Sequence, residues 1–207
     1  MLTLIRREFH DHLIYPLGSC TVSALAVAVM IYASFSGAQP LAAIIFPSLL
    51  LLISFVGFSG LGTAQMYGDR ANRISALLST LAVTRHRILT ARILVGILTV
   101  LLATVPVFVT AAILLRMFVP PPDFYRPMVV EISLTAILLG IACYSVGLLV
   151  GWTTSRAWLF VGNLLLLALS ASLIAVKGFG PEAMLLLVIF IAAVLGCTWH
   201  KFTSASL

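Results

Sequence analysis

Charged residues gather most densely in one segment of the chain, from Asp69 to Arg92, which reads DRANRISALLSTLAVTRHRILTAR. It contains one acid, five arginines and one histidine. Apolar residues recur within it at positions i, i+3, i+4 and i+7, namely Ile74, Leu77, Leu78 and Leu81. This spacing predicts a short amphipathic helix. Such a helix can act as a lever moved by a cytoplasmic partner, or it can lie passively on the membrane. Both interpretations fit the pattern equally well.

No residue pattern in the chain supports catalysis, a cofactor or a metal. A P-loop ends in Gly-Lys-Ser/Thr, and the only lysines, Lys177 and Lys201, follow Val176 and His200. The three cysteines form no CxxC pair, and the four histidines show no spacing typical of a metal site. We therefore expect no catalytic residue, no metal ligand and no cofactor, with any ATP hydrolysis located in a separate subunit.

The residues that usually couple transport to an ion gradient are also missing from the apolar runs. Ion-coupled transporters commonly place a carboxylate, histidine or lysine deep in the membrane, and the middles of the long apolar runs contain none of these. A proton antiporter is therefore disfavoured. A sodium ion held only by carbonyl and hydroxyl oxygens remains compatible with the sequence.

The composition of the 207 residues, 62% hydrophobic and 9% charged, is outside what a water-soluble chain can bury. It excludes a cytosolic enzyme, and a net charge of +6 from so few residues argues against a nucleic-acid binder. Uncharged apolar runs long enough to cross a bilayer occur at 17–35, 41–66, 93–115, 132–150, 157–176 and 183–199. We predict an all-α polytopic membrane protein with six transmembrane helices, formed as a single domain over 1–207.

The basic residues predict the orientation of these helices. One side of a six-span topology receives nine of them: Arg6, Arg7, Arg70, Arg73, Arg85, Arg87, Arg92, Arg156 and Lys201. The other side receives three: Arg116, Arg126 and Lys177. Since cytoplasmic loops carry the excess of lysine and arginine, both termini should be cytoplasmic.

The N-terminal residues 1–16 predict a helix lying in the membrane interface. Leu2, Ile5, Phe9 and Leu13 recur at helical spacing, and the charged residues fall elsewhere. Pro16 should mark the break at which the chain turns into the bilayer. The alternative is a basic flank that only sets the topology.

The Asp69 to Arg92 segment resembles the first cytoplasmic loop of ABC type-2 permeases, the membrane subunits of ATP-driven exporters. The matching positions are Asp69 and Arg70, Leu77 and Leu78, Val83 to Arg85, Ile88 and Leu89, and Ala91 and Arg92. The sequence departs from the family pattern at Arg73 to Ser75 and at Ala82, where the family has Gly-Thr-Leu and proline.

The resemblance implies a coupling helix within a coupling loop at 67–92, between the second and third spans, that contacts a separate ATP-binding cassette ATPase. The residues it assigns to this contact are Asp69, Arg70, Arg73, Ile74, Leu77, Leu78, Leu81 and Arg85. It also implies a dimer with a second copy or a homologous permease, in a bacterial or archaeal cytoplasmic membrane. A haem-handling permease of cytochrome c maturation, and a non-transporting scaffold that docks a cytoplasmic partner, are the alternatives.

Small and amide residues inside the runs predict helix contacts. Gly140, Gly147 and Gly151 offer one close-packing face, and packing within the chain is favoured over packing between subunits. Asn163 is the only amide well inside a run, and an interhelical hydrogen bond is favoured for it over a place in the substrate pathway.

Residues 177–182 form either a plain turn or a short re-entrant break. Apolar walls suit lipids, peptides and drugs alike, so no substrate is predicted.

Overall fold

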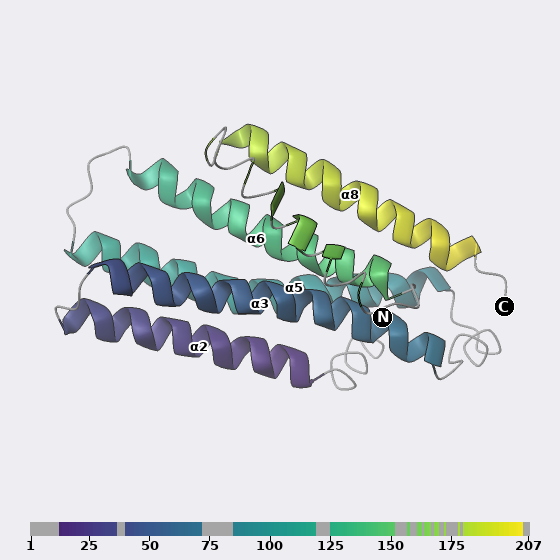
Figure 1. The fold of residues 1–207 in the computed structure, drawn as a ribbon, viewed down its shortest axis with the longest axis horizontal. Coiled ribbons are helices and arrows are strands. Elements are labelled where there is room, and N and C mark those ends of the chain that lie inside the picture. Colours follow the sequence, from purple (N-terminus) through teal and green to yellow (C-terminus); the bar gives the residue numbers. More distant parts are fainter. Residues whose placement is uncertain are drawn as a thin grey trace.

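The computed structural model describes residues 13–36, 40–71, 85–118, 125–151 and 180–204, together with residues 157, 161–162, 164–166, 168–169, 172 and 178. These residues form an all-helical bundle (Figure 1). Its long helices are α2 (Ile14–Phe35), α3 (Pro40–Ala71), α5 (Arg85–Phe118), α6 (Tyr125–Val150) and α8 (Pro181–Ser204).

Each of these five helices is long and apolar enough to cross a membrane. They contain the runs expected at 17–35, 41–66, 93–115, 132–150 and 183–199. The remaining expected span, 157–176, lies largely outside the described residues. Five such helices suggest an integral membrane protein. At 1.5 Å per residue the 34 residues of α5 extend about 50 Å, so this helix must project beyond the apolar layer or tilt within it.

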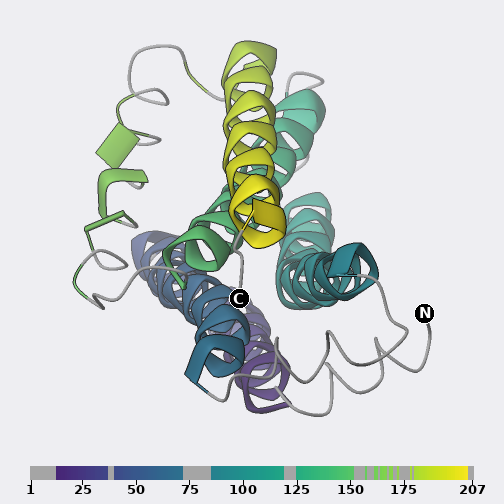
Figure 2. The same cartoon turned by 90° about the vertical axis from the view of Figure 1, so that its right-hand side faces the viewer.

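Consecutive helices run in opposite directions from α2 to α6 (Figure 1). One end of the bundle therefore collects the start of α2, the end of α3, the start of α5 and the ends of α6 and α8, and we call it the loop end. Viewed along the bundle, α2 and α8 lie on opposite sides, and α3 and α6 lie between them (Figure 2). Helix α3 packs against α6, α2 packs against α3 and α5, and α8 packs mainly against α6.

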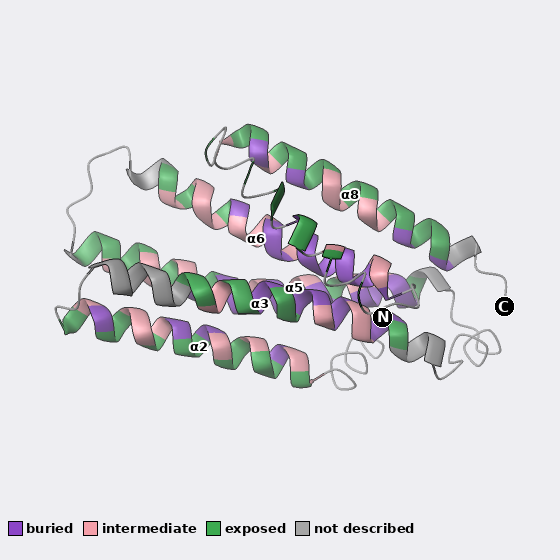
Figure 3. Cartoon of the chain, in the orientation of Figure 1, coloured by how far each residue is buried: buried purple, intermediate pink, exposed green. Residues whose placement is uncertain are grey.

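Buried side chains concentrate on α3, α5 and α6 toward the loop end (Figure 3). Every residue from 142 to 148 on α6 is buried, which makes α6 the central helix. Helix α2 buries little besides small residues, Ser23, Ala26 and Ala33, and α8 is similarly peripheral. The outward faces of the peripheral helices are apolar, as lipid contact requires.

Glycines let α3 and α6 approach closely. A Cβ atom on Gly147 would overlap the backbone carbonyl of Ser59, and one on Gly62 would lie 2.7 Å from the backbone nitrogen of Leu148. The Thr63 hydroxyl lies 2.9 Å from the Ser59 carbonyl oxygen of its own helix and 3.1 Å from the Gly147 carbonyl oxygen on α6, and it can donate to either. Lipid tails provide no hydrophobic drive for helix association, so close backbone packing of this kind is the main source of cohesion.

The other two glycines of the predicted packing face also lie at contacts within the chain. A Cβ atom on Gly140 would be 2.9 Å from Val100 Cγ1 on α5, and one on Gly151 would be 2.6 Å from Met66 Cβ on α3. Helix α6 therefore uses its glycines against α3 and α5 of the same molecule.

The helices of the structure begin and end at residues that differ from the expected boundaries at several places. The break predicted at Pro16 does not occur, because α2 begins at Ile14 and includes Pro16 in its first turn. Proline is tolerated there because the amide it lacks would have no partner within the helix. The start of α5 at Arg85 also places Arg87 and Arg92 in a helix, although the charge pattern assigned both to the loop. Residues 1–12 of the predicted interfacial helix lie outside the described residues.

Candidate functional site

Two buried polar side chains and one backbone carbonyl, from three different helices, meet near the loop end. The side chains belong to Gln65 on α3 and Tyr144 on α6, the carbonyl belongs to Arg92 on α5, and these residues are 1%, 1% and 3% exposed. The Tyr144 hydroxyl lies 2.7 Å from Gln65 Oε1 and 2.9 Å from the backbone carbonyl oxygen of Arg92. We call these residues the polar cluster. Buried polar groups are costly unless they are paired, so a single hydroxyl ties three spans together at this point.

Glycines on the neighbouring helices make room for the tyrosine. A Cβ atom on Gly96 would overlap the Cζ, Cε1 and Cε2 atoms of the Tyr144 ring. Gly96 stands one turn after Arg92 on α5, so the ring lies in the notch that Gly96 leaves and its hydroxyl reaches the Arg92 carbonyl. A Cβ atom on Gly62 would in turn meet the backbone carbonyl of Tyr144. Any side chain at either glycine would displace Tyr144.

The hydrogen bonds of the cluster can be arranged in two ways. A tyrosine hydroxyl has one proton, so Tyr144 can donate to Gln65 Oε1 or to the Arg92 carbonyl, but not to both. In the first arrangement Gln65 Nε2 has no partner among the described residues. Rotating the amide lets Nε2 donate to the Tyr144 oxygen while Tyr144 donates to Arg92, and Oε1 then takes the position of Nε2.

Arg92 brings a positive charge into this buried setting. Its guanidinium stays protonated in proteins, and Nη1 lies 3.9 Å from Met66 Sδ, so the side chain reaches from α5 to the last turns of α3. The only acid in the sequence between Asp11 and Asp123 is Asp69, which belongs to α3 three residues after Met66. The Asp69 side chain lies outside the described part of the structure.

Two members of the polar cluster lie at the two ends of the coupling loop, Gln65 just before it and Arg92 as its last residue. Gln65 precedes the end of α3 at Ala71 by six residues, and Arg92 follows the start of α5 at Arg85 by seven. At 1.5 Å per residue both lie about 10 Å inside the helices. The two helices that lead into and out of the loop are therefore fixed to each other and to α6 just below it.

The structure describes few of the predicted coupling residues. Asp69 and Arg70 belong to the last turn of α3 and Arg85 begins α5, but the placement of their side chains lies outside the description. The remaining residues, Arg73, Ile74, Leu77, Leu78 and Leu81, fall in 72–84, which is also outside the described residues. The same holds for Asn163.

Sequence reasoning missed all three members of the polar cluster as a site. Gln65 and Tyr144 were absorbed into apolar runs, and Arg92 was counted as a loop charge. The sequence does contain one signal for Gln65 and Arg92. Gln65 lies near the end of the apolar run before the loop, and Arg92 lies at the start of the run after it. Two adjacent antiparallel helices bring residues at these positions to the same depth. Tyr144 carries no comparable signal, because tyrosine is an ordinary residue near a membrane interface.

An apolar recess of about 200 Å³ lies between α2, α3 and α5. Gly18 and Gly57 form part of its wall, and a Cβ atom on either would meet no other atom within 4 Å. The hydroxyls of Ser54 and Thr99 in the wall donate to carbonyl oxygens one turn earlier in their own helices. The wall therefore presents a mostly apolar surface, which suits a hydrocarbon group.

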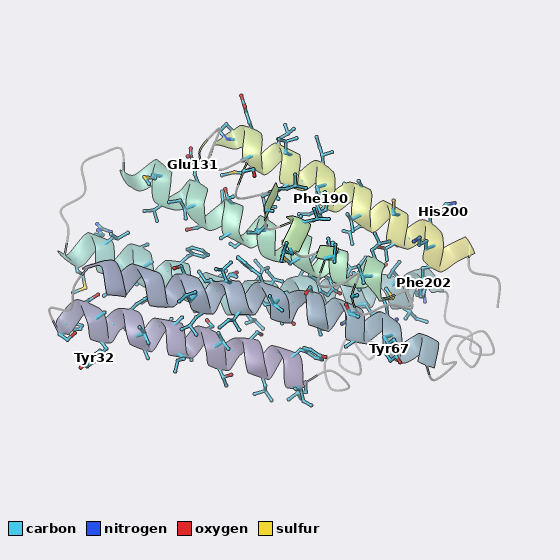
Figure 4. The ribbon with its side chains drawn as sticks, in the orientation of Figure 1. Tyr32, Tyr67, Glu131, Phe190, His200 and Phe202 are labelled. Atoms are coloured by element: carbon cyan, nitrogen blue, oxygen red, sulfur yellow. The ribbon has the colours of Figure 1, made fainter. Side chains whose placement is uncertain are left out.

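Four polar side chains and one phenylalanine lie toward the two ends of the bundle. Tyr67, His200 and Phe202 lie at the loop end, and Tyr32 and Glu131 lie toward the opposite end (Figure 4). Within the described residues no three His, Cys, Asp or Glu side chains come together as a metal site would need. Comparison with known proteins gave no match to any protein-family model, curated protein or solved structure.

Proposed function

We propose that the chain is the membrane permease subunit of an ABC exporter, which moves a substrate across the membrane with ATP hydrolysed by a separate nucleotide-binding subunit. In this proposal it has six transmembrane helices, the additional one within 157–176, and both termini on the cytoplasmic side of a bacterial or archaeal membrane. It works with a second copy or a homologous permease.

The observation that carries the proposal is the position of the polar cluster. Gln65 lies four residues before the segment that resembles a coupling loop, and Arg92 is the last residue of that segment. The Tyr144 hydroxyl lies within hydrogen-bonding distance of both. A lever must be attached firmly to the helices it moves, whereas a helix resting on lipid needs no such attachment. Burying an arginine and a glutamine at the base of the loop is costly, and this cost favours the lever interpretation.

The need for a partner subunit has a separate support. The sequence has no Gly-Lys-Ser or Gly-Lys-Thr triplet of the kind that ends a P-loop. The five described spans occupy most of the chain. With the proposed sixth span within 157–176, the coupling loop is the longest segment between spans. Energy from ATP must then come from a second protein that contacts a short cytoplasmic segment.

Truncating the apolar stripe of the coupling helix tests the proposal. Leu77→Ala with Leu78→Ala removes two side chains that we expect to fill a groove on the ATPase, and each buried leucine is commonly worth about 1 to 3 kcal/mol at an interface. At about 1.4 kcal/mol per tenfold, the double variant should bind the ATPase more than tenfold more weakly. Arg73→Ala, a charge expected at the rim, should have a milder effect.

The measurement uses the full chain in proteoliposomes with the ATPase that co-purifies with it in mild detergent. Partner retention and the rate of ATP hydrolysis are recorded for both variants, and membrane insertion is checked first. Full retention and full hydrolysis in the leucine double variant would show a passive surface helix. A partner that binds but hydrolyses no ATP would favour the scaffold.

A further inference from the structure

We propose that the polar cluster is the joint through which movement of the coupling loop reaches α6, with Tyr144 as the positioning residue. This inference rests on the proposed function and names the place in the bundle where the loop's displacement is transmitted. Tyr144 touches no substrate in this proposal. It acts by holding α6 to the two helices that bear the loop.

The geometry concentrates the connection on one side chain. Tyr144 belongs to the central helix, and its hydroxyl lies within hydrogen-bonding distance of α3 through Gln65 and of α5 through the Arg92 carbonyl. Gly62 and Gly96 leave no free space around its backbone and ring. Since tightly packed contacts do not deform smoothly, a shift of α3 or α5 must carry α6 with it or break these hydrogen bonds.

Gln65 provides the second observation. Its amide is buried, yet one of its polar atoms has no partner among the described residues. Buried unpaired polar groups are rare in native proteins because they are costly. Such a group is explained if it finds its partner in another conformation of the same protein.

A purely structural cluster leads to a different expectation. If the cluster only stabilised the bundle, loss of the Tyr144 hydroxyl would lower stability and leave ATP-driven movement intact in whatever protein remained folded. A joint instead predicts that folded, partner-bound protein loses movement at the far end of the bundle and keeps it at the loop end. The test therefore reads movement at both ends.

Spin labels at four exposed positions report this movement in a cysteine-free background. One pair joins Tyr67 on α3 to Lys201 on α8, beside His200 at the loop end, and the other joins Tyr32 on α2 to Val130 on α6, beside Glu131 at the opposite end (Figure 4). Distances between labels are measured in lipid nanodiscs with the co-purifying ATPase, before and after trapping with ATP and vanadate. Tyr144→Phe is compared with Tyr15→Phe, which removes a hydroxyl from a tyrosine outside the cluster.

We expect trapping to change both distances in the parent protein and in Tyr15→Phe. In Tyr144→Phe the ATPase should still bind and the loop-end distance should still change, but the far-end change should fall by at least half. If Tyr144→Phe does not fold, the double variant Tyr144→Phe with Gln65→Leu leaves no unpaired amide, and we expect the same loss from it.

Two unfavourable outcomes can be told apart. A parent protein whose distances do not respond to the ATPase and ATP would refute the proposed function, and the joint with it. A parent that responds, combined with a Tyr144→Phe variant whose far-end distance changes fully, would refute the joint alone.

Discussion

Replacing Tyr144 with phenylalanine removes one hydroxyl from the middle of the polar cluster and leaves the ring in the notch beside Gly96. The Arg92 carbonyl keeps its place in the hydrogen-bond ladder of α5, so it loses only an extra donor. Gln65 Oε1 loses its partner at 2.7 Å, while Nε2 was already unpaired. The variant therefore creates a buried amide with no partner among the described residues.

The expected cost follows from these losses. Hydrogen bonds between membrane helices contribute about 0.6 kcal/mol on average and up to about 1.7 kcal/mol, and an unsatisfied buried group adds about 1 kcal/mol or more. We expect Tyr144→Phe to lower the free energy of unfolding by about 1 to 2 kcal/mol. Gln65→Leu removes the same hydrogen bond together with the unpaired atom, and Tyr144 can still donate to Arg92, so this variant should be neutral or slightly stabilising.

The two substitutions together should therefore be far from additive. Once Gln65 is leucine, changing Tyr144 to phenylalanine strands no amide and should cost less than about 0.5 kcal/mol. Reversible unfolding in mixed lipid and detergent micelles, followed by tryptophan fluorescence or helical circular dichroism, gives all four free energies. Additive effects, within the roughly 0.3 to 0.5 kcal/mol seen for independent sites, would contradict the direct hydrogen bond and the unpaired amide on which the argument rests.

The close packing of α3 and α6 makes Gly147→Ala destabilising by about 2 kcal/mol in the same unfolding assay, because the added methyl group meets the backbone of Ser59. Gly196→Ala is its matched control: no atom lies within 4 Å of the added methyl group, so we expect neutrality or a gain of up to about 1 kcal/mol from helix propensity, and equal costs at the two sites would contradict the packing. For the topology, an impermeant thiol reagent should label Asp123→Cys in sealed cells and should label Arg85→Cys and Ser206→Cys only after lysis. Labelling of Arg85→Cys in intact cells would contradict the six-span topology.

The sequence was sufficient to predict the helical class and five of the spans. Runs of about 20 uncharged apolar residues admit few structures other than membrane-crossing helices, because the backbone must satisfy its hydrogen bonds internally in lipid. Boundaries were less accurate. Hydropathy locates the apolar layer, but a helix continues past that layer wherever its residues are good helix formers, as α5 does by beginning at Arg85.

Positive charge was the least reliable guide to depth. Counting arginines as loop residues treats each as solvated, and Arg92 is instead 3% exposed and packed across α3. The long arginine side chain can place its charge away from its own Cα atom, toward partners on another helix. Which partner it meets depends on the register between α3 and α5, and the sequence of either helix alone does not specify that register.

The polar cluster escaped prediction for a related reason. Its members are far apart in the chain, since Tyr144 follows Gln65 by 79 residues, and each one taken singly has an ordinary explanation. Their meeting depends on how closely the helices approach, which Gly62, Gly96 and Gly147 determine by having no side chain. Of these three, only Gly147 belongs to the packing face predicted on α6, and the sequence could not show what it packs around. In a membrane bundle, the residues that merely allow contact and the residues that connect the helices must therefore be identified together, from the structure.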